Sequence, residues 1–162
     1  MKNIFLGIGV LIFSISHGQY NGGNHTDILT NEFPSAKAEV MSVLDGIEQS
    51  IRDNDMDKLI AFHAYGPKFT EFKNGERRTG SLENEEFERG FLGSFTDVEK
   101  WELDDLKIAV YGNVANVTFH ADFVPIIEEE KLHMTGQFTL LFVKTPEGWK
   151  IVHEHMSPLN QE

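Results

Sequence analysis

The second half of the chain alternates apolar and polar residues over long stretches, the pattern that half-buried β-strands produce. In the clearest stretch, every second residue is apolar: Ala115, Val117, Phe119, Ala121 and Phe123. Residues 101–110 alternate as well, and residues 132–144 and 149–157 form two further predicted strands. The phase of the alternation changes at Asp104-Asp105, which predicts a β-bulge there. Short turns join the four stretches, so the sequence predicts an antiparallel meander.

The first half of the chain has helical patterns instead. Apolar residues recur at the three- and four-residue spacing of one helix face: Val40, Val43, Leu44, Ile47 and Ile51. A second, short helix is predicted after Asn54-Asp55 and ends before Gly66-Pro67. Asn74-Gly75 predicts a tight hairpin. Helices followed by an antiparallel meander define an α+β fold, in which the helices pack on one face of a curved sheet.

The amino-terminal residues predict export. Lys2 precedes an apolar run at residues 4–13, and small and polar residues follow it. This order matches a secretory signal peptide, and the run is shorter than the roughly 20 residues that a membrane-spanning helix needs. Ser16 and Gly18 provide the small residues for cleavage before Gln19. The predicted parts of an exported, periplasmic or extracellular protein are a signal peptide at 1–18, a flexible lead-in at 19–34 and a single domain at 35–158.

Composition narrows the class of partner. The 162 residues include 26 Asp and Glu, 14 Lys and Arg, and no cysteine. Cleavage would remove Lys2 and no carboxylate, which takes the formal net charge from −12 to −13. Because this charge repels phosphates and anionic headgroups, we expect the mature chain to bind neither nucleic acid nor membrane. Without cysteine the domain has no disulfide, so it must be stabilised by packing.

The carboxy-terminal segment TLLFVKTPEGWKIVHEHMS, residues 139–157, resembles the closing hairpin of SnoaL-like domains and of the association domain of calcium/calmodulin-dependent kinase II. In those domains a Gly-Trp turn precedes a hydrophobic pair and a His-x-His-x-Ser pattern. The matching residues here are Gly148, Trp149, Ile151, Val152, His153, His155 and Ser157. The segment MDKLIAFHAYGPKFTEF, residues 56–72, is similar to the second helix and first strand of the same family.

This resemblance covers residues 35–158 and implies the cone fold of the nuclear transport factor 2-like superfamily. In that fold the helices and the concave face of the antiparallel sheet enclose a pocket, which is a common place for a small ligand. The resemblance also implies a homodimer. It does not choose an activity, because this superfamily contains isomerases, cyclases and dehydratases as well as non-catalytic domains.

Polar residues that interrupt the apolar strands are the candidate site residues. His120 and Asp122 share one face of their strand, and His153 and His155 share one face of the last strand, because residues i and i+2 point to the same side. These four are the candidate catalytic residues. Four others are candidates for contact with a ligand: Tyr65, Glu71, Gln137 and Ser157. Alternation alone does not say which face of each strand lines the pocket.

Three interpretations of the histidines differ in their chemistry. His153, His155 and His120 could bind a metal ion, because His-x-His is a ligand spacing, but no further ligand completes a recognised site, and we predict no metal and no cofactor. A histidine beside Asp122 in an apolar pocket could transfer protons, as in an isomerase, cyclase or dehydratase. Alternatively, the histidines are structural hydrogen-bonding residues.

The sequence therefore predicts an exported domain that binds a small hydrophobic ligand in its pocket. Two alternatives stay open: an acid–base enzyme acting on a hydrophobic carbonyl compound, and a non-catalytic dimerisation or assembly module. A desolvated Asp122 beside a hydrogen-bond donor would favour the enzyme. A pocket filled by Phe and Met side chains would favour the assembly module.

Overall fold

The computed structural model describes residues 27–78 and 80–159. The predicted signal peptide and the first part of the predicted lead-in lie outside the described residues. None of the helices in the described ranges is both long and apolar enough to cross a membrane.

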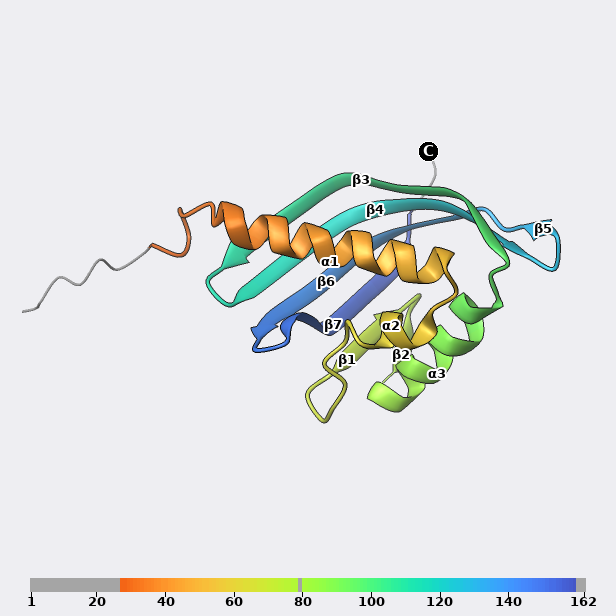
Figure 1. Ribbon diagram of the computed structural model, residues 1–162, viewed down its shortest axis with the longest axis horizontal. Coiled ribbons are helices and arrows are strands. Elements are labelled where there is room, and N and C mark those ends of the chain that lie inside the picture. Colours follow the sequence, from red (N-terminus) through yellow and green to blue (C-terminus); the bar gives the residue numbers. More distant parts are fainter. Residues whose placement is uncertain (1–26, 79, 160–162) are drawn as a thin grey trace, which may run out of the picture.

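One curved sheet forms the centre of the molecule (Figure 1). Its strands are β1 (Thr70–Lys73), β2 (Glu76–Arg78), β3 (Asp97–Tyr111), β4 (Val114–Ile127), β5 (Glu130–Lys131), β6 (Met134–Thr145) and β7 (Gly148–Pro158). Six strands lie in the order β2-β1-β7-β6-β4-β3, and β5 pairs with the end of β4. The pairings are antiparallel except that of β1 with β7, which is parallel.

The helices cover one face of this sheet. They are α1 (Pro34–Arg52), α2 (Met56–Ile60), α3 (Ser81–Phe91) and the short 3-10 helix η1 (Leu92–Ser94). Helix α1 runs across the sheet, while α2 and α3 lie together near β1 and β2 (Figure 1). The α+β cone fold predicted from the sequence is thereby confirmed.

Several local signals in the sequence have the predicted structure. The register of β3 against β4 shifts between Asp104 and Lys107, and Asp105 has a φ of 48°, which confirms the bulge. Asn74 and Gly75 have φ values of 52° and 78°, the left-handed conformations that a tight hairpin turn requires at both central residues. The parallel pairing of β1 with β7 was not predicted. It brings Glu71 opposite Glu154.

Strand β4 shows which face of the sheet packs under the helices. Ala115 and Val117 are completely buried, and the rest of that face, Phe119 to Phe123, is at most 9% exposed. The apolar face of β4 is therefore the concave, helix-covered face. His120 and Asp122 alternate with these residues and point to the outer face.

Candidate functional site

A cavity of about 150 Å³ lies between the helices and the concave face of the sheet. Most of its lining is apolar and much of it is aromatic: Phe87, Phe91, Trp101, Phe119, Phe123 and Phe138. Apolar pockets that contain a few convergent polar groups are the usual form of small-ligand sites. Apart from Glu102 on β3, the polar groups of this cavity gather where α3, β1 and β7 meet the segment that follows α2.

Three ionisable side chains form the centre of this polar end: His63, Glu88 and Glu154. His63 Nε2 lies 2.9 Å from Glu154 Oε1 and 3.4 Å from Glu88 Oε1. The side chain of His63 is 1% exposed, that of Glu88 10% and that of Glu154 17%. An imidazolium held between two carboxylates compensates part of the cost of burying each charge.

Tyr65 and Asn84 extend the cluster by hydrogen bonds. Tyr65 Oη donates to Glu88 Oε2 at 3.2 Å and accepts from Asn84 Nδ2 at 3.0 Å. Asn84 Nδ2 also donates to Glu154 Oε2 at 3.4 Å. The rings of His63 and Tyr65 stack with centroids 4.9 Å apart. The five side chains thus form one connected network, which we call the polar cluster.

Backbone pairing places the polar cluster. The residues after α2 run beside β7, where Ala64 N donates to Ile151 O and Ile151 N donates to Phe62 O. This pairing brings His63 next to β7. On α3, Asn84 and Glu88 are four residues apart, so they lie on the same helix face, and both are buried.

The polar cluster changes the protonation of its members. Burial opposes the charged form of His63, but the hydrogen bond to Glu154 and the charges of Glu154 and Glu88 outweigh it, and the pKa of His63 rises to about 9. Burial, together with the charge of Glu154, raises the pKa of Glu88 to about 7. Burial and the charges of Glu88 and Glu154 raise the pKa of the Tyr65 hydroxyl. At neutral pH, His63 is therefore mostly protonated, and Glu88 holds a proton more readily than an ordinary glutamate does.

A bulge in β7 decides which side of the last strand faces the cavity. Phe142 pairs with Ile151, but Leu141 pairs with His153, so Val152 is an extra residue in β7. Before this bulge the odd-numbered residues, Trp149 and Ile151, are buried. After it the alternation is reversed, so the even-numbered Glu154 reaches the cavity.

His153 and His155 lie on the other side of β7. His153 Nδ1 is 2.8 Å from Thr70 Oγ1. Both histidine rings contact Phe72, which is 50% exposed. The two histidines therefore share a face of the strand, as the spacing predicts, and His155 lies at the rim, where it borders the cavity as well.

Most of the other residues that the sequence predicted for the site lie in one of two places, the inner cavity or the outer face of the sheet. Tyr65 belongs to the polar cluster, and Glu71 lines the cavity and is 4% exposed. Four others line a groove of the outer face: His120, Gln137, His155 and Ser157. Gln137 Nε2 donates to Ser157 Oγ there at 2.8 Å.

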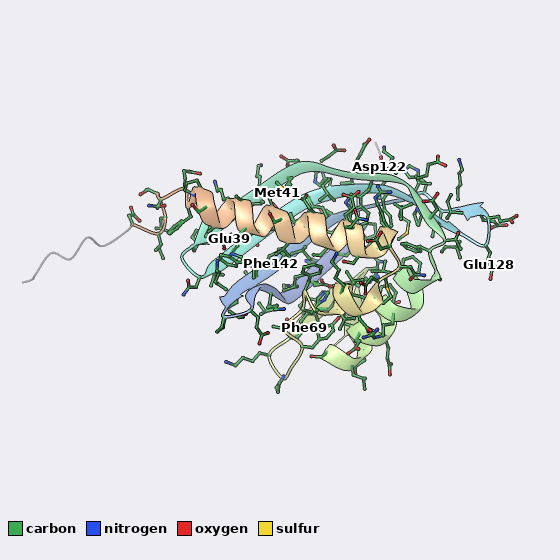
Figure 2. All side chains as sticks on the ribbon, in the orientation of Figure 1. Glu39, Met41, Phe69, Asp122, Glu128 and Phe142 are labelled. Atoms are coloured by element: carbon green, nitrogen blue, oxygen red, sulfur yellow. The ribbon has the colours of Figure 1, made fainter. Side chains whose placement is uncertain are left out.

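Asp122 is engaged elsewhere. It accepts hydrogen bonds from Lys100 at 2.8 Å and from His133 at 2.9 Å, and these bonds lower its pKa. Figure 2 shows it along the upper part of the sheet, away from α2 and α3 in this view. Asp122 is thus an ion-paired surface carboxylate, and it has no hydrogen bond to His120 or His153 in the described structure.

Sequence reasoning missed His63, Asn84, Glu88 and Glu154 as site residues. Polar residues on a short helix are usually solvated, so Asn84 and Glu88 carry no signal of burial. For Glu154 a signal exists: if the flanking histidines face outward, the residue between them faces inward. Among the described residues, His63, Glu88 and Glu154 are also the group whose ligand atoms, all within 4.8 Å of one another, could hold a metal ion.

The fold is shared with solved structures of the nuclear transport factor 2-like superfamily. A superfamily protein from Salmonella enterica is 25% identical, with a TM-score of 0.68 over 79% of this chain and 94% of that one. A candidate dehydratase from Streptomyces avermitilis is 18% identical, with a TM-score of 0.69 over 79% and 99%. A candidate kinase II association domain from Xanthomonas campestris is 16% identical, with a TM-score of 0.64 over 76% and 88%.

These similarities define the class: an α+β cone domain with a cavity under its helices. The chain belongs to the SnoaL-like domain family, whose model matches residues 40–161. No protein with a curated description matches the sequence significantly.

Proposed function

We propose that the protein binds a small, largely hydrophobic ligand in the cavity under its helices. The observation that carries this proposal is the combination of an aromatic cavity with a single buried polar cluster at one end. Such a cavity can remove an apolar ligand from water and orient its polar end. Phe and Met side chains line the space without filling it, which favours ligand binding over a purely structural assembly role.

Ligand retention tests this proposal. Native mass spectrometry of wild-type protein purified gently from its source cells should show a small molecule that stays bound to the chain. Ala121→Phe should abolish this binding, because Ala121 lines the cavity and is 6% exposed. Ala38→Phe is the matched control, since Ala38 is an exposed residue of α1 and does not line the cavity. Equal retention by both variants would contradict the proposal.

An acid–base enzyme is the second candidate function, and the pKa of Glu88 near 7 favours it. A carboxylate with such a pKa in an apolar pocket can act as a general base at neutral pH. Ligand binding ranks first because the donors of the polar cluster already have partners, so none is available to an oxyanion. Base-catalysed opening of a benzisoxazole probe, lost in Glu88→Gln, would support the enzyme; equal rates in both proteins would reject it.

We also propose that the domain acts after export, as the amino-terminal pattern predicts. The mature chain should begin near Gln19 and carry no lipid, because the sequence has no cysteine. Intact-mass measurement of the exported protein tests both points. A chain that still starts at Met1 would contradict this proposal.

We propose further that the domain is a homodimer that pairs through the outer face of its sheet. The described helices cover only the other face (Figure 1), so the outer face is available to a second copy. Light scattering should return about 32 kDa, twice the mass of the roughly 144-residue mature chain. A mass of about 16 kDa at tens of micromolar protein would reject the dimer.

A further inference from the structure

The hydrogen-bond donors of the polar cluster are all in use. His63 Nδ1 donates to Leu59 O at 3.3 Å, because a carbonyl oxygen can only accept, and Nε2 donates to Glu154. The Tyr65 hydroxyl donates to Glu88, and Asn84 Nδ2 donates to Tyr65 and Glu154. A ligand that needs a donor, such as a carbonyl compound or a carboxylate, therefore finds none in this cluster while Glu88 is ionised.

The acceptors of the cluster are in excess. Asn84 is completely buried and lines the cavity, yet its Oδ1 has no hydrogen-bond partner among the described residues. A buried amide oxygen without a partner costs free energy that a bound donor would recover. The carboxylates of Glu88 and Glu154 can also accept more hydrogen bonds than they accept in this network.

The charged groups and the aromatic rings of the cavity also favour a ligand that donates hydrogen bonds and carries a positive charge. The cavity lining holds four glutamates, Glu71, Glu88, Glu102 and Glu154, and two groups that are cationic at neutral pH, Lys73 and the buried His63, so the acidic groups are in excess among the described residues. Lys73 Nζ lies 3.1 Å from the centroid of the Phe87 ring. Ring faces of the cavity wall thus already hold one ammonium group, as cation–π attraction allows.

We propose that the ligand is an organic cation: a protonated amine attached to one apolar, ring-sized group. This inference rests on the proposed function and names the chemical class that the cavity selects. The ammonium would donate to Asn84 Oδ1 and to the carboxylates of Glu88 and Glu154, while its apolar part lies among the aromatic side chains. An apolar cavity of about 150 Å³ is large enough for benzene, so a benzyl group fits the volume found here.

Three probes of nearly equal shape test this class: benzylamine, benzyl alcohol and benzoate. Calorimetric titration at neutral pH should show benzylamine binding at least about tenfold more tightly than benzyl alcohol, and no binding of benzoate. Glu154→Gln should weaken benzylamine about tenfold and reduce the preference of the cavity for benzylamine over benzyl alcohol. Glu147→Gln, at an exposed turn residue, is the matched control and should bind all probes as the wild type does.

The outcomes separate this inference from the proposed function. If benzyl alcohol or benzoate binds as tightly as benzylamine, the cavity binds ligands but the cation class is wrong. If none of the probes binds at millimolar concentration, the inference fails, and retention by native mass spectrometry decides the proposed function separately. Stoichiometric zinc in the purified protein, lost in Glu154→Gln, would show that the cation is a metal and would overturn the amine. Because Glu154→Gln could unfold, the wild-type comparison of the three probes stands as a test by itself.

Discussion

His63→Ala should lower the free energy of unfolding by about 3–5 kcal/mol, because removing one partner of a buried ion pair leaves the other charges uncompensated. Glu154 and Glu88 would both lose the imidazolium that lies between them. The substitution also removes the ring that stacks on Tyr65. Urea unfolding followed by circular dichroism measures the loss.

His153→Ala is the matched control for this prediction. His153 has a hydrogen bond to Thr70 at the protein surface, so its loss should cost no more than about 1 kcal/mol. Equal costs for the two histidines would contradict the assignment of His63 as the buried partner of two carboxylates.

The stability of the protein should fall as the pH rises from about 5 to about 9. The pKa of His63 in the folded protein is about 9, above its ordinary value of 6.5. Its contribution is therefore fully present below pH 6.5 and is lost as the pH rises through 9, by about 3 kcal/mol for this shift. The raised pKa of Glu88, about 7 against 4.5, has the same sign, because its folded form also binds the proton more tightly.

Unfolding in urea at a series of pH values measures this dependence. Since both groups interact with Glu154, the two contributions should not be fully additive. Glu154→Gln removes the hydrogen-bond partner that raises the pKa of His63, so the fall above pH 7 should become shallower in this variant. A wild-type stability that is flat or rises between pH 6 and pH 9 would show that His63 is not held as an imidazolium.

The fold could be predicted from the sequence because its signals are local and repeated. The alternation in β4 runs through nine residues, 115–123, without interruption, and the bulge at Asp104-Asp105 is visible because two polar residues are adjacent there. The order of helices and strands followed from these local patterns, and it is the order that resembles the family. The parallel pairing of β1 with β7 has no comparable signal, since it depends on how α2 and the loop after it lie against the sheet.

The site was harder to predict because one bulge is hidden. Ile151 and Val152 are both apolar, so the extra residue leaves the apparent pattern of β7 intact while it turns His153 and His155 outward. The His-x-His spacing made the two histidines the candidate site residues, yet the residue that reaches the inner cavity is Glu154 between them. The partners of Glu154 come from separate segments, His63 after α2 and Asn84 and Glu88 on α3, which only the folded chain brings together.

A crystal structure of the protein with its bound ligand, or with benzylamine at high concentration, would show directly whether binding occurs in the inner cavity, at the polar cluster. We predict ligand density among the aromatic side chains of that cavity, with its polar end within hydrogen-bond distance of Asn84 Oδ1 and Glu154. Density in the outer groove between His120 and His155, with the inner cavity unchanged, would contradict it.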